Sequence, residues 1–239
     1  EIRPRDWSSD VCSSDLPRLF TYLLCIGICA LSSCKQFSNE NSINKSTTSS
    51  EIQTKTSEDT IVVDCNYSFE EAIAGTKAPQ KIIDQLTLIQ VRYYSFDSLL
   101  HQGQIVCHKS IANDLKEIFD FILETRFPVG KVIPMVKYNE SDPHSMNDNN
   151  SYCFCYRNAS YSKHALGLAF DLNPMQNPLR WKKGYEHRKD LPENANYNPT
   201  SPGTLYPQHP VVLKFEEKGF RWGHHFKRNH DDHHFEKRR

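Results

Sequence analysis

Apolar and polar positions divide the chain into three stretches of different character. A 13-residue apolar run occupies 19–31, and only three of the 26 residues in 35–60 are apolar. So few apolar side chains cannot offset the conformational entropy that folding costs, so residues 34–60 are predicted to form a disordered tether. From Ile61 onward apolar residues recur with helical or strand periods. We therefore predict one folded domain over residues 61–239, which is long enough to bury a substantial core.

Within residues 61–239 the hydrophobic period changes several times. Apolar residues at helical spacing predict an amphipathic helix over 110–125, and a capping box at 68–71 predicts a short helix after it. Segments rich in β-branched and aromatic residues predict strands at 86–94, 104–107 (after a turn at Gly103), 132–136, 152–157 and 168–172. Residues 138–150 and 177–208 are expected to be loops, and 210–218 a last helix. Without βαβ alternation, this pattern indicates an α+β fold with a small, mostly antiparallel sheet flanked by helices.

The apolar run 19–31 is too short to cross a membrane as a helix, because 13 residues span roughly 20 Å of a hydrocarbon layer about 30 Å thick. It is typical of a signal peptide, and the Leu31-Ser32-Ser33-Cys34 sequence after it resembles a bacterial lipobox. We predict a lipoprotein signal peptide at 17–33 and a lipidated Cys34, which would anchor the protein to a membrane from outside the cytoplasm, in the periplasm. An ordinary secretory signal and a buried helix are the alternatives. Residues 1–16 resemble translated sequencing-adapter read-through, and we expect them to be an artefact.

Charge and cysteine content narrow the function classes. Lys and Arg number 29 and Asp and Glu number 29, so net charge gives no reason to expect a nucleic-acid partner. The predicted domain contains Cys65, Cys107, Cys153 and Cys155, which in an oxidising compartment allow three disulfide pairings that the sequence does not distinguish. A zinc knuckle at Cys153 and Cys155 is an alternative, but no second closely spaced cysteine pair accompanies them.

Two segments hold most of the candidate chemistry. In the first, Ser162–Asp171, His164 and Asp171 lie on either side of Gly167, which would let the backbone turn and bring both side chains to one Zn²⁺ ion. The second, Trp222–Glu236, is rich in histidine and aspartate. Each segment alone is a weak signal, because a His and an Asp at such spacing are common on surfaces and a histidine-rich segment can bind metal adventitiously.

Together, the two segments resemble the signature pair of the D-alanyl-D-alanine carboxypeptidase (VanY-like) zinc peptidases, whose fold is shared with lysostaphin-type peptidases and the Hedgehog signalling domain. That pattern is S-x-H-x-x-G-x-A-x-D, followed by W-G-G-x-W-x-x-x-x-D-x-x-H-F-E. The matching positions are Ser162, His164, Gly167, Ala169, Asp171, Trp222, Gly223, Asp231, His234, Phe235 and Glu236. The likeness extends over roughly 86–236, including Ser145-Met146 and Tyr156-Arg157, and is strongest to the branch that includes L-alanyl-D-glutamate endopeptidases.

The resemblance implies a role for each matching residue. His164, Asp171 and His234 would be the zinc ligands, which leaves a fourth position for water. Asp231 would be the general base, and Arg157 would polarise the scissile carbonyl or hold a substrate carboxylate. Ser162, Trp222 and Ser145 would contact substrate. The implied activity is hydrolysis of a peptidoglycan stem peptide by a monomeric enzyme, at either a D-Ala-D-Ala or an L-Ala-D-Glu bond.

This chain departs from the family pattern at two positions, where His224 replaces a glycine and Phe226 replaces a tryptophan. The loss of an indole N–H makes substrate preference uncertain. His233 could take the metal in place of His234. If this segment is a strand, the two side chains face opposite ways and only one can reach the ion, and the family spacing favours His234.

Three other functions stay open. A Hedgehog-like zinc-binding module without catalysis would produce no new peptide termini. A periplasmic metal-binding lipoprotein would show several weak metal sites, whereas the peptidase predicts one tight site. A histidine-metal nuclease is a more distant alternative, since the balanced charge gives it no support.

Overall fold

The computed structural model describes residues 61–159 and 162–238. The predicted adapter artefact (1–16), signal peptide (17–33), lipidation site (Cys34) and tether (34–60) lie outside these residues. Among the described helices, none is both long and apolar enough to cross a membrane.

A three-stranded sheet with the order β1-β3-β2 forms the first part of the fold. Strands β2 (Leu86–Tyr94) and β3 (Leu100–His108) form an antiparallel hairpin, and β1 (Val62–Val63) pairs in parallel with β3. Along β2, the side chains of Ile89, Val91 and Tyr93 are buried while Gln90 and Arg92 are exposed, as the two-residue period of a half-buried strand requires.

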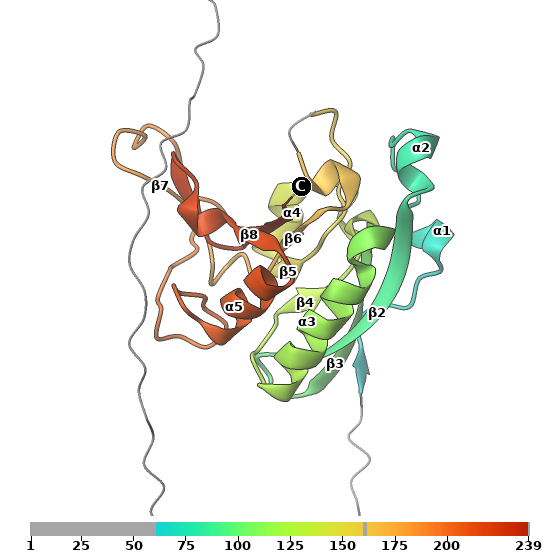
Figure 1. Cartoon of the computed structure of the whole chain (residues 1–239), viewed down its shortest axis with the longest axis horizontal. Helices are drawn as coiled ribbons and strands as arrows, with labels where there is room; N and C mark the ends of the chain where they lie inside the picture. Colours follow the sequence, from blue (N-terminus) through green and yellow to red (C-terminus); the bar gives the residue numbers. More distant parts are fainter. Residues whose placement is uncertain (1–60, 160–161, 239) are drawn as a thin grey trace, which may run out of the picture. The chain divides into compact units, whose positions relative to one another are not determined.

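Helix α3 (Ala112–Glu124) covers the buried face of this sheet (Figure 1). It follows the short 3-10 helix η1 (Lys109–Ile111) and buries Leu115, Ile118, Phe119 and Ile122. The predicted amphipathic helix is therefore confirmed, with a 3-10 turn at its start. Helix α5 (Pro210–Glu217) packs beside it and contributes to the same apolar core.

The second three-stranded sheet has the order β6-β10-β8 and is antiparallel throughout. Its central strand is β10 (His234–Lys237), flanked by β6 (Ala169–Asp171) and β8 (Phe220–Trp222). Phe235 in β10 is fully buried and its ring stacks on Phe215 of α5 at 3.9 Å between centroids. These apolar contacts hold β10 against the core and therefore fix the position of the residues beside Phe235.

Short elements complete the described part of the chain. They are α1 (Phe69–Ala72), α2 (Gln80–Ile83), β4 (Lys131–Val132), η2 (Met135–Tyr138), α4 (Asp142–Asn147), β5 (Asn150–Ser151), η3 (His164–Leu166), β7 (Leu179–Trp181), η4 (Gly223–His225) and β9 (Asn229–Asp231). The capping box predicted at Ser68 and Glu71 is present at the start of α1. The expected α+β class is consistent with this mixture, although the strands of residues 61–159 and 162–238 form four small sheets where one was predicted.

Several expected boundaries were wrong. The hairpin turn lies before Leu100, where the Leu99 N–H donates to Asp97 Oδ1, and Gly103 lies inside β3. A Cβ at Gly103 would lie 2.3 Å from the Val132 carbonyl oxygen, so this glycine allows two backbones to approach closely. The strand expected at 132–136 ends at Val132, because Pro134 follows and has no N–H for a ladder.

Residues 138–157 also differ from expectation. The predicted loop at 138–150 contains the helix α4. Residues 152–157 do not form the predicted strand, because the backbone N–H groups of Tyr152, Phe154 and Cys155 donate to carbonyls in three different segments. The four cysteines of the domain are all buried free thiols.

Candidate metal centre

The three predicted zinc ligands come from elements that the fold brings together. His164 lies in the 3-10 helix η3, Asp171 ends β6, and His234 begins β10. The antiparallel register pairs His234 directly with Asp171. Gly167 ends η3 with a φ of +66°, and its carbonyl accepts the His108 N–H at 2.9 Å, which attaches the turn to β3.

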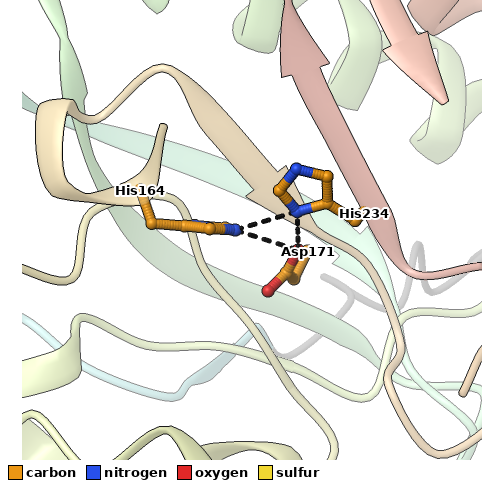
Figure 2. Close-up of side chains that lie close together, drawn as sticks. All are labelled: His164, Asp171 and His234. Atoms are coloured by element: carbon orange, nitrogen blue, oxygen red, sulfur yellow. Dashed lines mark hydrogen bonds and ion pairs between the residues drawn. The ribbon is translucent and has the colours of Figure 1, made fainter. Parts of the chain in front are cut away.

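The ligand atoms of these three residues meet at one point (Figure 2). His164 Nε2 lies 3.1 Å from Asp171 Oδ1 and 3.1 Å from His234 Nδ1, and His234 Nδ1 lies 3.0 Å from Asp171 Oδ1. Two ligand atoms bound to one tetrahedral Zn²⁺ at 2.0–2.1 Å would be roughly 3.3 Å apart. Two imidazole nitrogens and one carboxylate oxygen at nearly this separation fit a zinc ion that keeps an open fourth position.

The remaining nitrogen of each imidazole also has a partner. His164 Nδ1–H donates to the Cys153 carbonyl at 2.7 Å, and His234 Nε2 lies 3.4 Å from Glu236 Oε2. Such contacts fix the ring orientation and the tautomer of a metal-binding histidine, so that the other nitrogen presents its lone pair to the ion. The two rings are therefore oriented as zinc ligands need to be.

Electrostatics at this cluster favour a cation. Burial raises the pKa of Asp171, but the neighbouring His164 and His233 outweigh burial and hold the pKa well below its usual range. Burial alone would lower the pKa of His234, yet its contacts with Asp171 and Glu236 raise that pKa to about 10. The cluster therefore holds a proton at neutral pH that a divalent cation would displace, since histidine binds metal through a deprotonated nitrogen.

Asp231, the predicted general base, lies in β9 beside the three ligands. Its Oδ1 atom is buried and has no hydrogen-bond partner, although His233 Nε2 lies 3.1 Å away as an ion pair. Burial raises the pKa of Asp231, and the neighbouring histidines oppose this only in part. The carboxylate is therefore held as an ion pair with His233, and its raised pKa favours uptake of a proton.

His233 supports Asp231 and does not join the three ligands. It lies in the turn before β10, where its Nδ1–H donates to the Asn177 carbonyl at 2.8 Å. Its Nε2 lies 4.0 Å from the second carboxylate oxygen of Asp171, so both neighbouring histidines approach that aspartate. The two histidines were expected to face opposite ways only if both lay in a strand, and His233 lies outside β10.

Arg157 lies at the same cavity and is held by two side chains. Its Nη1 pairs with Asp142 Oδ2 at 3.0 Å, and its Nη2 donates to the Tyr152 hydroxyl at 3.2 Å. The Tyr152 hydroxyl in turn donates to Asp142 Oδ1, and the Tyr152 ring packs against His164 with centroids 5.0 Å apart. The Arg157 side chain is 38% exposed, so its guanidinium is fixed in direction yet open to a ligand.

The cavity has a volume of about 390 Å³, which suits a short peptide segment. The three candidate ligands line it together with Asp231, Arg157, Asp142 and Ser162. Apolar side chains on its wall are Met146, Leu179, Leu191 and Phe226.

Two predicted substrate contacts are corrected by burial. Ser145 is fully buried, and its hydroxyl accepts a hydrogen bond from Asn150 Nδ2. Trp222 is 1% exposed and its Nε1–H donates to the Asp232 carbonyl at 2.8 Å. Both residues hold the scaffold together. Asp142, Tyr152 and Glu236 were not predicted as site residues; Asp142 lies in a segment expected to be a loop and Tyr152 in one expected to be a strand.

Comparison with known proteins gives one match, to a family of peptidases. No curated protein and no solved structure matches the chain significantly. The three ligands, Asp231 and Arg157 all lie within residues 157–237, and this segment matches the family model described as D-alanyl-D-alanine carboxypeptidase, which supports a metallopeptidase.

Proposed function

We propose that the protein is a zinc-dependent peptidase that hydrolyses the stem peptides of peptidoglycan. The observation that carries the proposal is the convergence of His164, Asp171 and His234, whose ligand atoms lie 3.0–3.1 Å apart at the wall of a cavity. The match of residues 157–237 to the carboxypeptidase family supports the substrate class. The bond cleaved would be a terminal D-Ala-D-Ala bond or an internal L-Ala-D-Glu bond.

His164, Asp171 and His234 would hold the zinc ion. When bound, Zn²⁺ supplies Lewis acidity, which polarises a carbonyl group and makes water more acidic. Asp231 would then take the proton from the attacking water and deliver it to the leaving amine. Its carboxylate lines the cavity beside the three residues, and a raised pKa brings the carboxyl closer to the working pH, where proton transfer in both directions is efficient.

Arg157 would hold the substrate. Its guanidinium cannot lose its charge and offers several donors, which suits a developing negative charge on a carbonyl oxygen or the carboxylate of a peptide terminus. The contacts from Asp142 and Tyr152 hold it toward the cavity. Ser162, which also lines the cavity, would be a further hydrogen-bonding partner of the substrate.

The proposal includes a location outside the cytoplasm. Peptidoglycan lies outside the cytoplasm, so it agrees with the signal peptide and the lipid anchor on Cys34 that the sequence predicts. We further propose that the protein acts as a monomer, without a nucleic-acid partner.

Mass spectrometry of defined muropeptides incubated with the zinc-loaded protein tests the proposal. We expect new termini with the wild type and a roughly 10²–10⁴-fold lower rate with Asp231→Asn, which removes the base. The variant should retain one tightly bound zinc, because Asp231 is not one of the three ligands. Asp120→Asn, an exposed change on α3, is the matched control and should cleave like the wild type.

The outcomes separate the alternatives. Cleavage by Asp231→Asn at the wild-type rate would remove that residue from its proposed role. A wild type that binds zinc tightly and releases no termini from any muropeptide would indicate the non-catalytic zinc-binding module. The mass of the product identifies the bond, since loss of one D-alanine and release of the stem peptide from its first L-alanine give different fragments.

A further inference from the structure

A second group of metal-binding side chains lies outside the first centre. One ring nitrogen of His224, one of His230 and one carboxylate oxygen of Asp232 lie within 4.8 Å of one another. His224 comes from η4, His230 from β9 and Asp232 from the turn that follows β9. None of the three lines the cavity at the first centre. The two groups therefore share no residue, and the second lies entirely within residues 224–232.

Hydrogen bonds orient both imidazoles of this second group. His224 Nδ1–H donates to Asp232 Oδ1 at 2.6 Å, and His230 Nδ1–H donates to the His224 carbonyl at 2.8 Å. In a neutral ring whose Nδ1 is a donor, Nε2 carries the free lone pair. The rings lie 4.5 Å apart between centroids and are tilted by 37°. Each ring thus has the partner that a metal-binding histidine ordinarily has on its other nitrogen, a carboxylate for one and a carbonyl for the other.

Asp232 is an unusually well-anchored carboxylate. It is fully buried, and its Oδ2 accepts hydrogen bonds from Arg180 Nε at 3.0 Å and Nη2 at 2.6 Å. Arg180 is itself held in place by stacking over the Tyr197 ring at 3.9 Å. The Oδ1 contact at 2.6 Å is shorter than the roughly 3.3 Å between two ligands of one tetrahedral ion. It is therefore a hydrogen bond that orients His224, which assigns metal binding to the two imidazoles.

Packing against the apolar scaffold explains the position of His224 but not that of His230. The His224 ring stacks on Trp222 with centroids 4.5 Å apart, so it is also held by the apolar scaffold. His230 has no such aromatic partner among the described residues except His224 itself, and it is only partly buried. The His224 carbonyl engages His230 Nδ1, so Nε2 is the His230 nitrogen left for a cation, and the centroids of the two rings lie 4.5 Å apart.

We propose that His224 and His230, oriented by Asp232, form a second binding site for a divalent transition metal that prefers imidazole, such as Zn²⁺. The site binds more weakly than the first centre. Arg180 neutralises Asp232, and there are two nitrogen ligands where the first centre has two nitrogens and an ionised carboxylate. Water would complete the coordination. This site does not depend on whether the first centre hydrolyses peptides.

Zinc titration of the full chain, followed by native mass spectrometry and calorimetry, tests this site. We expect two zinc ions per wild-type chain, bound with clearly different affinities. His224→Ala and His230→Ala should each lose the weaker ion and keep the tighter one. His225→Ala removes an exposed imidazole from the same short helix and is the matched control; it should keep both ions.

The tighter ion also serves as a control for folding, because a variant that keeps it has assembled the β6–β10 pairing. Asp171→Asn should show the reverse pattern and weaken the tighter ion while the weaker ion stays. A wild type with a single zinc ion would overturn the second site. Two ions in both His224→Ala and His230→Ala, or loss of the weaker ion in His225→Ala, would overturn its assignment to His224 and His230.

Discussion

Replacement of Gly167 with alanine tests whether a steric constraint places the first zinc ligand. Gly167 ends the 3-10 helix that carries His164 and has a φ of +66°. A Cβ at this position would lie 2.8 Å from the backbone nitrogen of His108 and 2.8 Å from a methyl carbon of Leu86. The Leu86 side chain can adjust, but the His108 backbone belongs to β3 and cannot move without disturbing that strand.

The expected loss of stability in Gly167→Ala has two parts. A non-glycine residue in the left-handed region costs about 1 kcal/mol or slightly more. Forcing a methyl group into a well-packed region costs about 1–3 kcal/mol. We therefore expect Gly167→Ala to lower the free energy of unfolding by about 2–4 kcal/mol. In a domain of this size each kcal/mol lowers the melting temperature by about 2–4 °C.

Gly75 provides the matched control. It also has a positive φ, +79°, but a Cβ there would meet no atom within 4 Å. Gly75→Ala therefore measures the conformational cost alone, and we expect a loss of about 1 kcal/mol. Chemical denaturation of both variants, followed by circular dichroism, gives the difference that the contact with His108 causes.

The same variants link the turn to the metal centre. A displaced η3 moves His164 away from Asp171 and His234, so Gly167→Ala should bind zinc at least about tenfold more weakly, as is usual when a ligand loses its support. Gly75→Ala should bind zinc like the wild type. Equal destabilisation by the two alanines, with unchanged zinc affinity in both, would refute the claim that this contact positions His164.

Three further predictions concern other parts of the domain. Asp142→Asn should reduce kcat/KM for muropeptides about tenfold without changing zinc affinity, because it loosens Arg157 and leaves the ligands untouched; unchanged kinetics would contradict this. Contacts with Asp64 and Asp97 raise the pKa of His101 even though burial opposes them. The stability advantage of wild type over His101→Gln should therefore be greatest below about pH 6.5 and shrink as the pH rises through the raised pKa of His101. Denaturation of both proteins across pH 5.5–8.5 measures this advantage, and an advantage that grows with pH would contradict the raised pKa. Removal of zinc with a chelator should abolish cleavage and lower the melting temperature, and zinc at 100 times its Kd should restore about 2.7 kcal/mol; a melting temperature that does not depend on zinc would exclude a folded-state site.

The sequence predicted the long elements and the grouping of the ligands, for different reasons. Strand 86–94 and the helix that buries Leu115 and Ile118 have strong periods, so local pattern suffices. The grouping of His164, Asp171 and His234 followed from a family resemblance, and not from any period. The three ligands meet because β10 pairs with β6 across 63 residues of chain, and local propensity carries no information about such a pairing.

The errors have physical causes too. Gly103 was assigned to a turn because glycine favours turns, but in this chain it makes room for the Val132 backbone. The apolar sequence 152–157 has strand propensity, yet its N–H groups bond to three separate segments. Ser145 and Trp222 match a family pattern, but a match does not say whether a residue contacts substrate or supports the scaffold. Their burial shows that both belong to the scaffold.

The central position of β10 also has a consequence for biosynthesis. His234 is translated 70 residues after His164, which at about 5–20 residues per second is a delay of roughly 4–14 s. A nascent chain that already displays His164 and Asp171 on the ribosome still lacks its third ligand and the neighbouring Asp231. The metal centre is therefore complete only when β10 docks between β6 and β8, so an incomplete translation product lacks the site to which we assign hydrolysis.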